Sequence, residues 1–159
     1  MGLDNLPAKQ SLAALTKYAF SLAQDKLLLV SPFLDEDSAK WLSTALKGAT
    51  KRHVRVYLIS HGLNEGNEQI KRTLAIYRDS TPDIRIFTTA KRKKPSYFLL
   101  HAKLTIADVK YAVLSTANLT QYGLRSHLEV GVGLTGEPVR HLEQLISQLL
   151  LTNLVEEVR

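Results

Sequence analysis

The chain has 159 residues, 45% of them hydrophobic, with only 8 glycines and 5 prolines; this predicts one domain over residues 1–159 and excludes a disordered chain. The absence of cysteine excludes disulfides, thiolate zinc sites and a cysteine nucleophile. The net charge of +6 indicates an anionic partner, and because no apolar run approaches the roughly 18 residues that cross a bilayer, we expect a cytoplasmic protein without stable membrane insertion.

Helical and strand patterns alternate over the first ninety residues. Apolar residues recur at helical spacing from Leu12 to about Ala23, and Pro7 is suited to open this helix. Asp35 is a suitable N-cap for a second helix, which Gly48 would end. The alternation favours a layered α/β fold. A third helix is expected over 67–78, and strands are expected over 26–31, 53–60 and 84–88.

The remaining residues predict three successive strands and one helix. The strands are expected over 99–107, 111–116 and 127–134, with a tight turn between the first two. Apolar residues from Val139 to Leu150 recur at the spacing of an amphipathic helix. The expected fold is a mixed sheet covered by helices on both faces.

Basic residues are concentrated in the middle of the chain. Residues 51–110 hold 13 basic and 5 acidic residues, and the excess peaks in one run that ends near Tyr97. Such a run indicates a polyanion, nucleic acid first and an anionic membrane second, while a solvated loop is the alternative. Tyr97 is placed to stack on bases. The run consists of Lys91, Arg92, Lys93 and Lys94.

Polar residues interrupt two of the predicted strands in a regular way. Alternation places His101 and Lys103 on one face of their strand, roughly 7 Å apart. On the last strand the same alternation places Glu129 on a face shared with Gly131 and Gly133. These glycines leave room for a ligand or a neighbouring chain. The sequence thus predicts an imidazole and an ammonium presented together on one strand face, and a carboxylate on a polar or semi-buried face of another.

The spacing of these residues resembles the HKD motif of the phospholipase D superfamily. In this sequence His101-x-Lys103 is followed after four residues by Asp108, and after six more by Ser115-Thr116-x-Asn118. Glu129 stands where the family commonly has a glutamate. The resemblance implies an α/β/α sandwich with a mixed central sheet. Ser115 replaces the motif glycine, which would narrow the phosphate pocket, and Thr116 replaces serine but keeps the hydroxyl.

The resemblance also implies a role for each motif residue. His101 attacks phosphorus and forms a phosphohistidine that water later hydrolyses, without a metal or other cofactor. Lys103, Thr116 and Asn118 bind the phosphate oxygens. Glu129 accepts a hydrogen bond from the histidine ring and holds its tautomer. The remaining motif residues, Asp108 and Ser115, are expected to be structural.

One histidine cannot act both as the nucleophile and as the acid that protonates the leaving alkoxide. The chain carries one motif, whereas longer members of the family carry two. Short members form their site across a homodimer, so the resemblance implies a twofold dimer in which two copies of His101 line one cleft.

Three functions are compatible with these residues. The first is a metal-independent endonuclease or phosphodiesterase that acts on DNA or RNA with weak sequence preference, because phosphate contacts position a strand without identifying it. The second is a phospholipase D or phosphatidyl transferase, since the same chemistry serves any phosphodiester. The third is an inactive or partner-dependent nucleic-acid-binding subunit of a bacterial defence or repair system.

Overall fold

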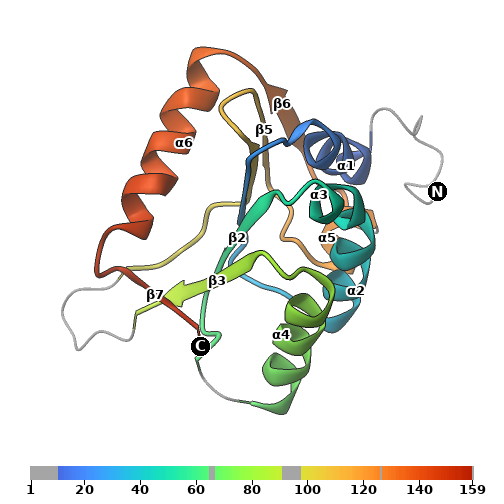
Figure 1. Ribbon diagram of the computed structural model, residues 1–159, viewed down its shortest axis with the longest axis vertical. Coiled ribbons are helices and arrows are strands. Elements are labelled where there is room, and N and C mark those ends of the chain that lie inside the picture. Colours follow the sequence, from blue (N-terminus) through green and yellow to red (C-terminus); the bar gives the residue numbers. More distant parts are fainter. Residues whose placement is uncertain (1–10, 65–66, 91–97, 126, 159) are drawn as a thin grey trace.

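The computed structural model describes residues 11–64, 67–90, 98–125 and 127–158, which form one seven-stranded sheet (Figure 1). Its strands are β1 (Lys26–Val30), β2 (Arg55–Ser60), β3 (Ile84–Thr89), β4 (Leu104–Ala107), β5 (Tyr111–Ser115), β6 (Gly131–Leu134) and β7 (Val155–Glu157). They lie in the order β6-β5-β4-β1-β2-β3-β7. The strands β1, β2 and β3 are parallel, and the other pairs are antiparallel. The predicted mixed sheet is confirmed.

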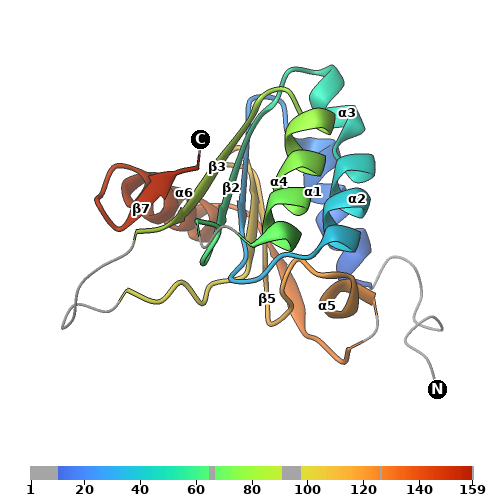
Figure 2. The ribbon, with the colours of Figure 1, turned by 90° about the horizontal axis from the view of Figure 1, so that it is seen from below.

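Helices cover both faces of the sheet, as predicted. They are α1 (Leu12–Leu22), α2 (Glu36–Ala45), α3 (Lys47–Lys51), α4 (Glu68–Ser80), α5 (Gln121–Arg125) and α6 (Glu137–Leu150). Figure 2 shows α1 to α5 on one face and α6 on the other. Within the described ranges no helix has both the length and the apolar character needed to cross a membrane.

The central strands are apolar on both sides because both of their faces are covered. In β1 the side chains of Leu27 and Leu29 lie in the core beneath α1 and α2, whereas Leu28 and Val30 lie in the core beneath α6. All four side chains are buried. This explains the continuous apolar run in the sequence, because a strand covered on both faces cannot show polar alternation.

Several predicted ends differ from the observed ones. The strand expected from residue 99 begins at Leu104, the first residue that pairs with both β1 and β5. The strand expected from residue 127 begins at Gly131, opposite the last residue of β5. Gly48 lies inside α3 and does not end the helical region, and α1 begins after its N-cap Ser11. The short elements α5 and β7 were not predicted.

The two glycines of β6 do not leave a vacant space, so this prediction was wrong. A side chain at Gly131 would meet Leu12 of α1, and one at Gly133 would collide with the ring and hydroxyl of Tyr111. The Tyr111 ring in turn packs edge-on against Tyr18, with ring centroids 5.2 Å apart. The absent side chains therefore let α1 and an aromatic ring approach the edge of the sheet.

We expect Gly133→Ala to lower the free energy of unfolding by about 1–3 kcal/mol, because the added methyl group overpacks a filled site. Urea denaturation measures the change. Gly48→Ala is the matched control: the nearest atom to its added carbon is Arg52 Nη1 at 3.4 Å, and alanine is the better helix former. Equal stability of Gly133→Ala and the wild type would contradict the packing described.

Candidate active site

The motif residues other than Asp108 lie at the edge of the sheet where the parallel strands end. Val30, the last residue of β1, pairs with Leu104, the first residue of β4. The segment with His101 and Lys103 therefore crosses beyond the carboxyl end of β1. In open α/β sheets this edge is the usual place for ligands, because the connecting loops supply side chains there.

The structure brings His101 and Lys103 into contact. Lys103 Nζ lies 3.2 Å from His101 Nε2 and 3.5 Å from His101 Nδ1, and it donates to the backbone oxygen of His101 at 3.0 Å. The imidazole is exposed and the lysine half-buried. The two residues do not share a strand face, because the segment is not a strand. Their side chains instead fold together at the start of β4.

Thr116 and Glu129 form a second pair across the ends of β5 and β6. The Thr116 hydroxyl donates to Glu129 Oε2 and accepts from the Val130 amide at 3.0 Å. The Thr116 amide donates to the Val130 oxygen at 2.9 Å. Glu129 Oε1 also lies 4.0 Å from Nδ1 of His127. The threonine hydroxyl thus has both a donor and an acceptor within the protein.

The hydrogen bond expected between His101 and Glu129 is not present among the residues that the structure describes. Glu129 accepts from Thr116 instead, while the imidazole of His101 contacts Lys103. The reason is local: β6 begins beside the end of β5, so Thr116 lies opposite Val130 and within reach of the adjoining Glu129.

Asn118 has an incomplete set of hydrogen bonds. Its Oδ1 is buried and has no partner among the described residues. Leaving a buried acceptor without a partner costs about 1–3 kcal/mol, so a hydrogen-bond donor that reached this oxygen would stabilise the loop. The backbone around it is held firmly, because the amide of Leu119 donates to Ser31 Oγ at 2.9 Å.

Ser31 and Gly123 position this loop, and sequence reasoning did not single them out. A side-chain carbon at Gly123 would lie 2.6 Å from the backbone oxygen of Asn118, so only glycine lets α5 pack against the loop. Ser31 directly follows β1 and is fully buried. A glycine inside a short polar segment was the available signal for Gly123.

Ser115, in place of the motif glycine, is accommodated by a glycine on the next strand. It pairs with Gly131, and a side chain there would lie 3.3 Å from the Ser115 Cβ. The Ser115 hydroxyl donates to the oxygen of Ala117 at 3.3 Å. The serine side chain therefore contacts its own loop and occupies room left by the glycine of β6.

Asp108 binds three backbone amides at the amino end of β1. Its carboxylate accepts from Gln24 at 3.1 Å, from Asp25 at 3.0 Å and from Lys26 at 2.9 Å. The residue has a φ of +52°, which aspartate tolerates better than most residues. Partial burial raises its pKa, but the three amides and nearby Lys110 outweigh burial and hold the pKa below its ordinary value.

We expect Asp108→Asn to lower the free energy of unfolding at pH 7 by about 1–2 kcal/mol, because charge-assisted hydrogen bonds are lost at a partly exposed site. The folded-state pKa is depressed, so the stabilisation is present above the ordinary pKa of 3.8 and is lost as the pH falls through the folded value. Urea denaturation at pH 7 and pH 3 measures this. The gap to the wild type should shrink at pH 3, and the exposed control Asp79→Asn should change little.

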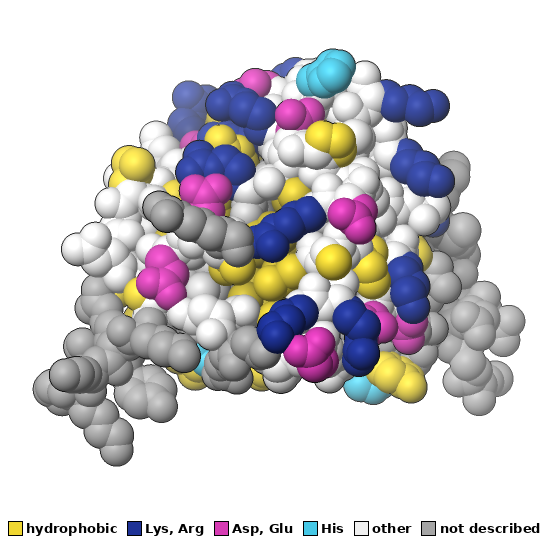
Figure 3. Space-filling view, turned by 60° about the horizontal axis from the view of Figure 1, so that its bottom comes forward, with side chains coloured by type: hydrophobic (Ala, Val, Ile, Leu, Met, Phe, Trp, Pro, Cys, Tyr) yellow, Lys and Arg dark blue, Asp and Glu magenta, His cyan; other side chains and the backbone are white. Residues whose placement is uncertain are grey.

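The predicted nucleic-acid-binding residues Lys91, Arg92, Lys93, Lys94 and Tyr97 lie outside the described residues. On the face shown in Figure 3, the described basic and acidic side chains are interspersed around hydrophobic ones. Within the described ranges, no three histidine, aspartate or glutamate side chains are placed to hold a metal ion.

Comparison with known proteins identifies the family. The family model for the cardiolipin synthase, PLD-like domain matches residues 17–150. The chain belongs to this phospholipase D-like family. The resemblance seen in the motif is therefore confirmed, and the observed fold is the one that it implied.

Among the proteins similar to this PLD-like chain are one curated protein and two proteins of known structure. The DISARM protein DrmC of Bacillus paralicheniformis is 26% identical over 140 residues, which are 86% of this chain and 55% of that protein. NucT from Helicobacter pylori has a TM-score of 0.69 at 23% identity, covering 91% of each chain. Nuc from Salmonella typhimurium, a phospholipase D family member, has a TM-score of 0.69 at 19% identity, covering 95% of this chain and 93% of its own. The chain thus spans about half of the curated relative and nearly all of the two solved structures.

Proposed function

We propose that this PLD-like protein is a metal-independent phosphodiesterase, specifically an endonuclease with weak sequence preference that works as a homodimer. The observation that carries the proposal is that the His101–Lys103 pair and the Thr116–Glu129 pair lie at the same end of neighbouring strands, in a chain of this family. The amide of Ser115 donates to the oxygen of Lys103 there at 3.1 Å. An imidazole can supply the nucleophile for phosphodiester cleavage, and an ammonium and neutral donors can stabilise the charge on the phosphate oxygens.

The proposed reaction is a double displacement on phosphorus. A ring nitrogen of His101 attacks, the bond from phosphorus to the leaving oxygen breaks, and that oxygen takes a proton from a second imidazole. Water then attacks the phosphohistidine, gives its proton to the second imidazole and releases His101. Lys103 binds a non-bridging oxygen, and this requires its ammonium to exchange the histidine ring for phosphate.

Glu129 is proposed to hold the tautomer of His101 during the reaction. This requires its carboxylate to exchange the Thr116 hydroxyl for the imidazole. The released hydroxyl would then be free to donate to the phosphate, together with the amide of Asn118. Asp108 is proposed to remain structural, because its carboxylate is engaged by three amides at the amino end of β1.

A second copy of the chain is proposed to supply the second imidazole. Large apolar side chains are exposed beside the Thr116–Glu129 pair, which is unusual for a surface that faces only water. Val130 follows Glu129 directly and Val132 lies two residues further on, while Leu114 precedes Ser115 and pairs with Val132. We call this set the edge patch; it consists of Leu114, Leu128, Val130 and Val132.

Nucleic acid is the proposed substrate for two reasons. The run from Lys91 to Lys94 precedes His101 by fewer than a dozen residues in the sequence, so its positive charges are close in sequence to the proposed nucleophile. Basic runs grip phosphate backbones without reading sequence. NucT and Nuc have the same fold, although at under 25% identity they support the proposal only through that likeness.

Incubating the protein with plasmid, single-stranded DNA, RNA and phosphatidylcholine vesicles in EDTA tests the proposal. We expect nicking or cleavage of nucleic acid that survives chelation. Phospholipid headgroup release without cleavage would instead support a phospholipase or phosphatidyl transferase, a candidate favoured by the family's cardiolipin synthase description. Binding of nucleic acid without any cleavage would support a partner-dependent subunit of a defence system, a candidate favoured by the likeness to DrmC.

A further inference from the structure

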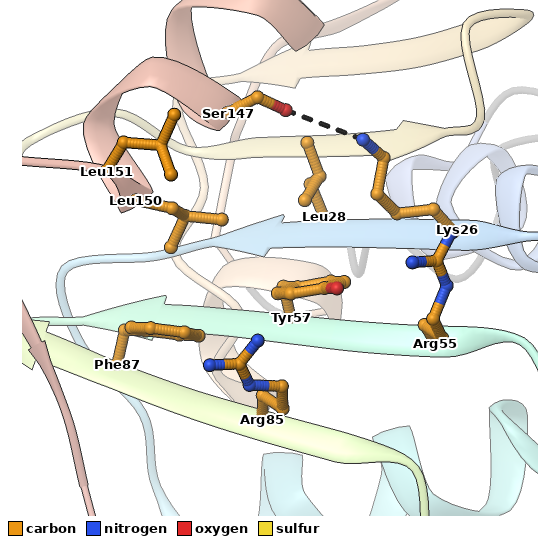
Figure 4. Close-up of a pocket in the computed structure, with 9 residues that line it drawn as sticks. All are labelled: Lys26, Leu28, Arg55, Tyr57, Arg85, Phe87, Ser147, Leu150 and Leu151. Carbon is orange, nitrogen blue, oxygen red and sulfur yellow. Dashed lines mark hydrogen bonds between the residues drawn. The ribbon is translucent and has the colours of Figure 1, made fainter.

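A groove opens on the α6 side of the sheet, over β1, β2 and β3. Its volume is about 350 Å³, within the range of sites for small ligands. Figure 4 shows its walls: three strands form the floor, and the end of α6 forms one side. We call it the sheet-face groove; it is lined by Lys26, Leu28, Arg55, Tyr57, Arg85, Phe87, Ser147, Leu150 and Leu151.

The groove exists because α6 covers only part of this face. Alternate residues of β1, β2 and β3 point to the same side, and strand pairing places Leu28, Tyr57 and Arg85 in one row across the sheet. Leu28 is buried near α6, Tyr57 is half-buried, and Arg85 is exposed. The side chains of this row therefore become more exposed from β1 to β3, with increasing distance from α6.

Two aromatic rings stack against each other in this groove. The rings of Tyr57 and Phe87 are stacked, with centroids 6.3 Å apart and planes inclined by 19°. The guanidinium of Arg85 lies over both, 5.7 Å from the Tyr57 centroid and 5.2 Å from the Phe87 centroid. Aromatic and guanidinium planes presented together on an open sheet suit a planar ligand.

Three cationic side chains line the groove, and each also has an acidic partner. Arg85 pairs with Glu157 through Nε and Nη2, and Lys26 contacts Glu143. Arg55 pairs with Asp25 through Nη2 only, at 2.7 Å and 2.8 Å. The Arg55 side chain is also hydrogen-bonded to that of Tyr57. A guanidinium carries five N–H groups, more than these two partners occupy, so Arg55 can donate to another anion.

The groove leads towards the candidate active site. Lys26 and Arg55 pair with each other at the amino end of the strands, whereas Phe87 lies in the last row with Ile59 and Val30. Four strand residues, roughly 13 Å, separate the two ends. Val30 is also the residue opposite the start of β4, which follows the His101 segment.

We propose that the sheet-face groove binds an unpaired nucleotide of a single-stranded nucleic acid, with the base on Tyr57 and a phosphate on Arg55. A planar ring with an adjoining anion matches the stacked rings and the guanidinium donors that Asp25 and Tyr57 leave over. An apolar peptide would leave three charged side chains desolvated, which is costly. The inference rests on the nucleic-acid part of the proposed function and adds the strandedness of the substrate.

Photocrosslinking tests where the strand lies. The probe is a single-stranded oligonucleotide carrying 4-thiothymidine, bound to the His101→Ala variant so that it stays intact. Trypsin releases residues 56–71 as one peptide containing Tyr57. We expect mass spectrometry to find the adduct on Tyr57. Adducts confined to residues outside the groove would overturn the inference.

Binding of variants gives an independent measure. Tyr57→Leu keeps an apolar side chain on β2 and should weaken binding of single-stranded DNA about tenfold, because one stacking contact is lost. Binding of the matching duplex should not change, since its bases are paired. The control is Tyr18→Leu, which removes an exposed tyrosine on α1.

Arg55→Gln tests the phosphate contact and should reduce the slope of log affinity against log salt concentration by about 0.7. Equal losses for single strand and duplex, or a free mononucleotide bound as tightly as the strand, would overturn the inference.

Hydrolysis of a small chromogenic phosphodiester separates this inference from the proposed function. That substrate has one phosphate and no strand to occupy the groove, so its hydrolysis by the wild type measures the catalytic step alone. If the wild type does not hydrolyse it while the Tyr57 adduct forms, the proposed catalysis fails and the groove stands. If the wild type hydrolyses it but forms no adduct, the groove fails and the catalysis stands.

Discussion

His101→Ala is expected to abolish phosphodiester hydrolysis, with a loss of about 10⁴-fold or more. The imidazole is proposed as the nucleophile that forms the covalent intermediate, so its removal leaves no route for double displacement. The measurement is the turnover of a chromogenic diester and of plasmid DNA in EDTA. His141→Ala is the matched control, because His141 is exposed on α6 and pairs there with Glu137.

A labelled diester gives a second observation on the same residue. Rapid acid-free quenching should trap a phosphorylated protein that is labile in acid, and the label should map to His101. Turnover of His101→Ala at more than a tenth of the wild-type rate would rule out the proposed nucleophile. Activity that disappears in EDTA and returns with a divalent cation would rule out the metal-independent reaction.

Val132→Glu is expected to convert a dimer into monomers and to remove most of the nuclease activity. The side chain lies in the edge patch beside the Thr116–Glu129 pair, and a buried unpaired carboxylate in an interface costs several kcal/mol. A monomer would also lack the second imidazole. Light scattering measures the mass, and plasmid cleavage measures the activity.

The control for this prediction is Leu145→Glu. Leu145 is 60% exposed on α6, compared with 48% for Val132 on β6, so both residues expose apolar surface while only one adjoins the motif. The control should leave mass and activity unchanged. A wild-type protein that is monomeric and still cleaves would disprove the shared site.

Much of the fold could be predicted because local patterns determine it. The helix α2 begins after Asp35, its predicted N-cap, and α4 begins within the range predicted for it, after Asn67. Each of these two side chains accepts a hydrogen bond from the backbone amide three residues on. The run that became β1 was recognised by its apolar character. Short elements escaped prediction: β7 has 3 residues and forms because β3 offers it an edge, which no local pattern reveals.

The identities of the candidate site residues could also be predicted, but their contacts could not. Motif spacing singled out His101, Lys103, Thr116, Asn118 and Glu129. It could not indicate that Glu129 contacts Thr116, because that contact depends on β6 beginning beside the end of β5. The sequence likewise could not indicate that the space beside Gly133 is filled, because Tyr111 occupies it from the neighbouring strand.

The amino-acid sequence by itself determined the family, the alternation of strands and helices, and the residues that carry the proposed chemistry, because periodicity and motif spacing are properties of the chain. Only the tertiary structure decided which polar groups meet, where apolar side chains remain uncovered, and how Tyr57, Arg85 and Phe87 gather in one groove. These features arise from pairing between strands distant in sequence, and hydrogen bonds and ring contacts act only over a few ångströms.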